Sequence, residues 1–143
     1  MKRFKICLIC IMLILGCIQI PVSAMGTDIV PYYNNTVNAN SYFTISEDGV
    51  ATVDISYHGV SDITTGATIT TKIQKRTLGL IWTTVDIGTT DNVWIDESTS
   101  VTFSTSHSVK LKSKGTYRVA VDFVIRGTGG ANDEISQTAT CEY

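Results

Sequence analysis

Apolar and polar residues alternate along one short segment after another from residue 42 onward. In the clearest segment, Tyr117 to Arg126, the odd-numbered positions are apolar and the even-numbered ones include Arg118 and Asp122. Such alternation is typical of β-strands that bury one face and expose the other to water. The same period of two recurs in six further segments: 42–46, 51–57, 67–76, 80–87, 100–111 and 134–142.

Turn-forming sequences separate these segments, and no segment keeps the period of 3.6 residues that a helix requires. The segments are rich in Thr, Val, Ile and aromatic residues, which suit pleated sheet surfaces. About seven short strands at regular spacing predict an all-β fold, a single antiparallel β-sandwich over residues 42–143. Residues 25–41 have weak periodicity and several turn formers, so we expect a flexible lead-in there with at most a short edge strand.

The first 24 residues have the three parts of an export signal. They are the basic sequence MKRFK, an apolar stretch, and the small residues of PVSA before a cleavage point after Ala24. The apolar stretch is interrupted by Gly16, Gln19 and Pro21, and it is short for a membrane span of roughly 20 apolar residues. We therefore expect residues 1–24 to be a cleaved signal peptide and the mature chain to be extracellular.

Cys17 offers a second cleavage point, at which a lipid anchor would be attached. It is followed by the apolar sequence IQIPVSA, however, and a lipidated cysteine is usually followed by a polar tether. The released chain is therefore the favoured prediction, and a lipoprotein anchored at Cys17 is the minority alternative.

Cleavage after Ala24 changes both the charge and the cysteine content. It removes three of the 11 basic residues and none of the 13 acidic ones, so the net charge falls from −2 to −5. This acidic balance argues against general binding of nucleic acid. Only Cys141 stays, so no internal disulfide can form. Cys141 falls on the apolar face of its segment, which predicts a buried thiol. An intermolecular disulfide is the alternative.

Two stretches of the chain carry a family resemblance. The sequence KGTYRVAVDFVI at 114–125 is similar to the penultimate strand of bacterial immunoglobulin-like domains, and KIQKRTLGLIWTTVD at 72–86 resembles a central hairpin. Over residues 42–140 the chain resembles small secreted, uncharacterised immunoglobulin-like β-sandwich proteins of Firmicutes. The resemblance implies an immunoglobulin-like sandwich in which the Tyr117 hydroxyl closes a corner on nearby backbone. It offers no catalytic residues, and the antibody-type cysteine pair is absent.

Catalysis finds little support in the sequence. A hydrolytic triad needs a nucleophile, a base and an orienting acid in contact. The only histidines are His58, in a turn, and His107, which alternates inward, and no serine lies in a nucleophile-elbow motif. We expect His107 to be a rim or core histidine with one hydrogen-bond partner. The chain is predicted not to be an enzyme, with a small extracellular hydrolase as the alternative.

Calcium binding is the one metal hypothesis that the residue types suggest. The segment DIGTTDNVWIDE holds Asp86, Asp91, Asp96 and Glu97, whose carboxylates are the hard oxygen ligands that calcium prefers. The spacing of a regular calcium loop is missing, so a solvated acidic loop is the favoured interpretation. No cofactor is predicted.

Basic and aromatic residues give the best indication of a binding surface. Tryptophan rings stack on sugars or anchor protein partners, and basic side chains on neighbouring strands would form a stripe suited to an anionic cell-wall polymer or an acidic protein patch. A solvated, charge-balanced face is the plainer alternative. The candidate residues are Lys72, Arg76, Trp82, Trp94, Arg118 and Arg126.

These observations predict a secreted, non-catalytic binding module of the bacterial cell exterior. A carbohydrate-binding module is a further alternative, although no planar trio of aromatic residues is evident.

Overall fold

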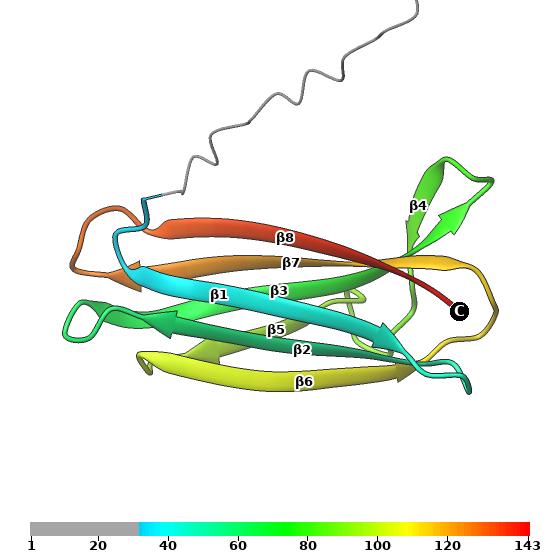
Figure 1. Ribbon diagram of the computed structural model, residues 1–143, viewed down its shortest axis with the longest axis horizontal. Helices are drawn as coiled ribbons and strands as arrows, with labels where there is room; N and C mark the ends of the chain where they lie inside the picture. The colour runs from blue at the N-terminus through cyan, green and yellow to red at the C-terminus, as the bar shows by residue number, and fades with distance from the viewer. Residues whose placement is uncertain (1–31) are drawn as a thin grey trace, which may run out of the picture. The chain divides into compact units, whose positions relative to one another are not determined.

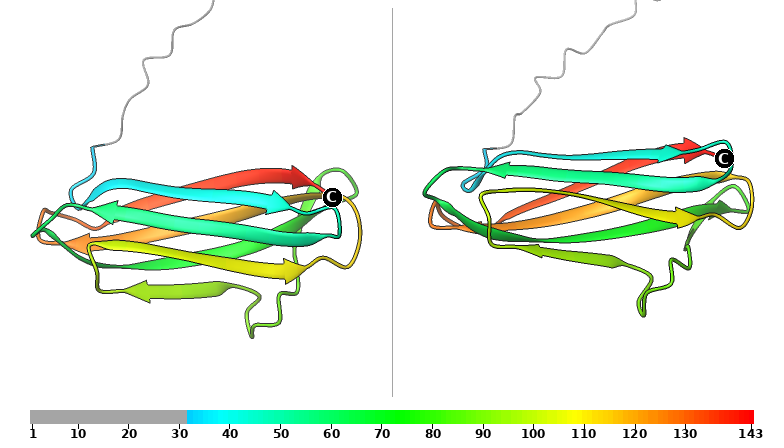
Figure 2. Two further views of the ribbon diagram at one scale, coloured as in Figure 1. Left: turned by 60° about the horizontal axis from the view of Figure 1, so that its bottom comes forward. Right: turned by 90° about the horizontal axis from the view of Figure 1, so that it is seen from below.

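The computed structural model describes residues 32–143, which form eight β-strands in two antiparallel sheets packed face to face (Figures 1 and 2). The predicted signal peptide, both cleavage points and residues 25–31 of the predicted lead-in lie outside this range. Within the described residues, no helix is long and apolar enough to cross a membrane.

Sheet A has the strand order β1-β2-β6, and sheet B has the order β4-β3-β7-β8, with β5 also paired to β3. The strands of sheet A are β1 (Thr36–Ile45), β2 (Val50–Gly59) and β6 (Thr102–Lys110). Those of sheet B are β3 (Thr64–Thr77), β4 (Ile81–Thr84), β5 (Trp94–Ser98), β7 (Thr116–Gly127) and β8 (Asp133–Glu142).

This connectivity is that of an immunoglobulin-like sandwich, and it confirms the predicted fold class. The first, second and sixth strands share one sheet, and the third, seventh and eighth share the other, as strands A, B, E and C, F, G do in that fold. The corner at the start of β7 is also present. The Tyr117 hydroxyl donates a hydrogen bond to the carbonyl oxygen of Ser113 at 2.5 Å.

The core forms from the apolar faces that the alternation predicts. Val53 and Ile55 of β2 face Ile69 of β3 and Val121 and Phe123 of β7, and all five side chains are fully buried. Burying a side chain of this size contributes about 1.5–3 kcal/mol. Since Cys141 is the only cysteine in the described residues, the sandwich is held by this burial rather than by a disulfide.

Strand β1 begins at Thr36, six residues before the boundary that the sequence pattern predicts. The carboxylate of Asp133, at the start of β8, accepts hydrogen bonds from the backbone N–H of Asn34 (2.8 Å), the backbone N–H of Asn35 (2.7 Å) and the hydroxyl of Thr36 (2.7 Å). The buried Asn35 side chain donates to the carbonyl of Ala131 at 2.8 Å. Polar contacts therefore order a segment that has no hydrophobic pattern.

Strand β5 lies where the sequence predicts an acidic loop, and β4 ends at Thr84, short of the predicted 87. The register of β5 on β3 turns Trp94, Asp96 and Ser98 inward and Ile95 outward. The alternation is thus inverted, with two polar residues inside and an isoleucine in water. Hydrophobic periodicity does not identify such a strand, so the expected seven strands are eight.

Candidate functional site: a cationic face beside an apolar hairpin

The outer face of sheet B carries five of the six predicted surface residues. Lys72 and Arg76 lie on β3, and Trp82 on β4 pairs with Arg76. Arg118 on β7 pairs with Gln74 of β3, so its side chain emerges between those of Lys72 and Arg76. These residues therefore gather at the end of the sheet where β3 meets β4.

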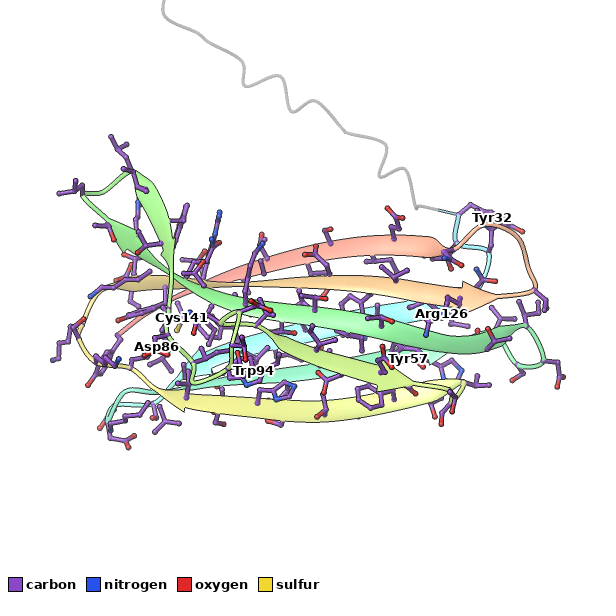
Figure 3. The ribbon with its side chains drawn as sticks, turned by 180° about the vertical axis from the view of Figure 1, so that it is seen from behind. Tyr32, Tyr57, Asp86, Trp94, Arg126 and Cys141 are labelled. Atoms are coloured by element: carbon purple, nitrogen blue, oxygen red, sulfur yellow. The ribbon has the colours of Figure 1, made fainter. Side chains whose placement is uncertain are left out.

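Arg126 and Trp94 do not join this group. Arg126 lies on the same face but near the start of β3, where its Nη1 donates to the hydroxyl of Thr68 at 2.7 Å (Figure 3). Trp94 is paired with Thr71 on β5 and points between the sheets, packed against the core (Figure 3). The prediction of Trp94 as a surface aromatic is therefore wrong, because β5 turns it inward.

Arg118 is held in a fixed position over an aromatic ring. Its guanidinium carbon lies 4.5 Å from the centroid of the Trp82 ring, and its Nε donates to Oε1 of Gln74 at 2.8 Å. A cation over a tryptophan face gains about 0.5–1 kcal/mol at an exposed site. Fixing the guanidinium in advance lowers the entropy that a ligand would lose in ordering it.

Several cations at this end of the sandwich have no acidic partner. The Lys75 ammonium donates to the hydroxyl of Ser113 at 2.5 Å, which places the loop between β6 and β7 beside the end of β3. Within residues 32–143, the only lysines in ion pairs are Lys110, with Asp48, and Lys112, with Asp86. We call the unpaired group the cationic collar: Lys72, Lys75, Arg76, Lys114 and Arg118.

The two acids in these ion pairs are stabilised in their charged forms. The pKa of Asp48 is lowered by hydrogen bonds from the Ser46 hydroxyl and from Lys110 and by the charge of Lys110. The pKa of Asp86 is lowered by its hydrogen bond from Lys112 and by one from the backbone N–H of Gly88. Both carboxylates are therefore engaged by lysines outside the collar. Glu142, which is paired with Thr116 at the same end of sheet B, accepts a hydrogen bond from the Thr116 hydroxyl and, in the described part of the chain, forms no ion pair with a collar residue.

The β3–β4 hairpin projects from this end of the sandwich (Figure 1). Its turn places Leu78 at φ 52° and Gly79 at φ 72°, and the N–H of Leu80 donates to the carbonyl of Thr77 at 3.3 Å. Positive φ at both central positions is the pattern of a type I′ turn, which favours Asn-Gly. A leucine in this conformation costs roughly 1–2 kcal/mol.

The leucines of this turn are also the most exposed apolar side chains of the hairpin. Leu78 is 86% exposed, Leu80 83% and Ile81 56%. We call these three residues the apolar tip. These residues are not among the predicted surface residues. The signal for them is the pair of apolar residues that flank the turn glycine, because turns are normally polar.

His107 lies away from the collar, at the edge of the sandwich where β5 of sheet B meets β6 of sheet A. Its Nε2 lies 2.7 Å from Oδ2 of Asp96, and the Trp94 ring stacks on the imidazole at a centroid distance of 4.8 Å. This agrees with the prediction of a rim or core histidine with one hydrogen-bond partner, and the imidazole is half-buried. His58 is exposed on β2, and within residues 32–143 no hydroxyl group is hydrogen-bonded to either imidazole.

The acidic residues of the calcium hypothesis do not converge. Asp86 binds Lys112 in the loop after β4, whereas Asp96 faces His107 inside the sandwich. In the described part of the chain, no group of three or more His, Cys, Asp or Glu side chains is placed to hold a metal ion.

Cys141 lies on the inner side of β8 as a free thiol, but it is half-buried rather than fully buried. It pairs with Tyr117 one residue before the end of β8, where the core gives way to solvent. The expectation of a fully buried thiol is thus only partly met.

No pocket is found in residues 32–143. Comparison with protein-family models, with curated proteins and with solved structures returns no match to this chain. The collar holds cations that form no ion pair in the described residues, and the apolar tip holds exposed hydrophobic side chains. Both lie at the same end of the sandwich.

Proposed function

We propose that the chain is an exported, non-catalytic binding module of the bacterial cell exterior, of the kind it resembles in Firmicutes. It binds a negatively charged partner through the cationic collar. The observation that carries the proposal is Arg118, which is fixed on Trp82 among cations that have no acidic partner in the described residues.

The distribution of charge supports this function more than the net charge does. Cleavage after Ala24 would leave a chain of net charge −5, which repels polyanions as a whole. All five collar residues nevertheless lie at one end of the sandwich, and the nearby Asp48 and Asp86 are engaged by other lysines. A local positive field of this kind attracts an anionic partner at short range, within a Debye length of about 8–10 Å.

The alternatives receive less support from the geometry. A sugar-binding module presents open aromatic faces, but one face of Trp82 is occupied by the Arg118 guanidinium and Trp94 points inward. A hydrolase of the triad type needs a hydroxyl or thiol against its histidine. His107 has a carboxylate partner in Asp96, but within residues 32–143 no hydroxyl is hydrogen-bonded to its imidazole, and the Trp94 ring covers one face of it.

The proposal is tested by retention of the exported chain on purified anionic cell-wall polymer. Arg118→Glu should weaken retention by about tenfold or more, because each basic residue near an anionic surface is worth about 1 kcal/mol and the substitution reverses one. The loss should shrink as salt is raised.

Arg126→Glu is the matched control, since it makes the same charge change on the same strand away from the collar. Retention that is equal in the parent chain, the Arg118→Glu variant and the control would contradict the proposal.

A further inference from the structure

The apolar tip concentrates exposed hydrophobic side chains. Three of the seven large hydrophobic residues exposed in the described range belong to it, and they lie within four consecutive positions. Single exposed hydrophobic residues are ordinary, whereas a cluster on a projecting element marks a place of interaction. Leu78 also occupies a turn position that Asn would fill with less strain, so its presence runs against the local conformational preference.

The cationic collar lies behind this tip, on the end of β3, the start of β7 and the loop between β6 and β7. Arg76 precedes the turn by two residues, and its partner Trp82 carries Arg118 on its ring. Lys75 contacts Ser113, which brings the loop that holds Lys114 to the same end of the sandwich. A projecting apolar tip is thus followed, towards the sandwich, by several positive charges and a tryptophan.

An anionic phospholipid bilayer offers a counterpart to both features. Its hydrocarbon accepts the leucines, its headgroups accept the cations, and tryptophan favours the interface between them. A soluble polyanion would leave the tip in water. A second copy would need an apolar recess to receive the tip, and the described residues of this chain form no pocket. The area of three side chains is also far below the roughly 1,000 Å² of a specific protein interface.

We infer that the apolar tip inserts into an anionic phospholipid bilayer while the cationic collar binds the surrounding headgroups. This inference rests on the proposed function, because it names the negatively charged partner of the same end of the sandwich. It adds a requirement that the proposed function lacks, since Leu78 and Leu80 must contribute to binding.

The test is cosedimentation of the exported chain with vesicles of phosphatidylglycerol in phosphatidylcholine, and with vesicles of phosphatidylcholine alone. The parent chain should bind only the anionic vesicles. The double variant Leu78→Asn with Leu80→Asn should bind them at least about tenfold more weakly, because two apolar side chains are lost from the inserted surface. Fluorescence of Trp82 should shift to the blue on binding and be quenched by brominated lipid.

Three comparisons separate the contributions. Val37→Thr removes an exposed apolar side chain at the opposite end of the sandwich and should bind like the parent chain. Dextran sulfate, a polyanion without hydrocarbon, should bind the parent chain and the leucine variant equally and the Arg118→Glu variant weakly. Thermal unfolding should show that the leucine variant is at least as stable as the parent, since Asn-Gly suits the turn.

Each outcome decides the question. Equal vesicle binding by the parent chain and the leucine variant, or equal binding to neutral vesicles, overturns lipid insertion. Binding to dextran sulfate without binding to vesicles overturns the inference and leaves the proposed function standing. Failure to bind either overturns both. If the parent chain binds no vesicles but binds an extracellular protein, and the leucine variant no longer binds that protein, the inference is overturned. The apolar tip is then a protein-binding site.

Discussion

At the scale of single residues, the core contains one polar group without a partner. The Thr71 side chain is fully buried in the middle of β3, and within residues 32–143 its hydroxyl makes no hydrogen bond. Leaving such a group unpaired costs about 1–3 kcal/mol. Valine has nearly the same shape and no hydroxyl, so the site has room for an apolar replacement.

We therefore expect Thr71→Val to raise the free energy of unfolding by about 1 kcal/mol. Chemical denaturation measures the change. Thr70→Val, on the outer face next to it, is the control and should change stability by less than about 0.5 kcal/mol. A Thr71→Val chain less stable than the parent would show that the hydroxyl is satisfied, for example by a buried water.

At the scale of elements, polar bridges close both long edges of the sandwich. On one side, Gln137 of β8 donates to the carbonyl of Ala39 at 2.7 Å and accepts from Ser41 at 2.8 Å, both on β1. On the other side, His107 of β6 meets Asp96 of β5. The Asp133 carboxylate adds a third tie at the start of β1. These bridges fix how the two sheets meet where apolar burial ends.

Asp133→Ala should lower the free energy of unfolding by about 2–4 kcal/mol. It leaves two backbone N–H groups and the Thr36 hydroxyl without their acceptor in a buried site. Hydrogen exchange should show the start of β1 released first. Glu134→Ala, the exposed neighbour, should have little effect. A similar loss in both variants would assign the effect to β8 rather than to the carboxylate.

A strand can be predicted from the sequence when burial of an alternating apolar face stabilises it, and not when polar contacts to distant residues do. Strand β7 follows from Val119, Val121 and Phe123 alone, because burial of an alternating face orders it. Strand β5 does not, since the positions that its register turns inward hold Trp94, Asp96 and Ser98. The partner of Asp96, His107, lies on β6 and comes beside it only in the folded chain. The alternation that places Lys72 and Arg118 on the outer face assigns Lys75 to the inner face, so it does not predict that Lys75 joins them. The contact of Lys75 with Ser113 is visible only in the structure.

At the scale of the whole molecule, the location of the charged residues matters more than the net charge. The collar gathers at one end, where Asp48 and Asp86 are held by Lys110 and Lys112. The pKa values of Asp48 and Asp86 lie below the ordinary 3.8. Between the ordinary and the lowered pKa, the unfolded chain binds protons that the folded chain does not. The stability that both groups contribute is therefore complete above pH 3.8 and is lost as pH falls through the folded values.

The double variant Asp48→Asn with Asp86→Asn should lose this part of the acid dependence, with only a small change at pH 7 because both pairs are exposed. The free energy of unfolding, measured against pH, checks the expectation. The substitution also releases Lys110 and Lys112, so retention on anionic polymer should increase. Unchanged acid dependence would mean that other carboxylates control acid unfolding.

The apolar tip and the start of β1 lie at opposite ends of the sandwich (Figure 1). In the lipoprotein alternative, in which Cys17 carries the anchor, a pull between the start of β1 and a surface that holds the hairpin would run parallel to the strands. Because ladder hydrogen bonds lie across that direction, it would load many of them in shear at once rather than open them one by one. A module bound in this way would resist flow and traction, and would yield only when whole strands slide past each other.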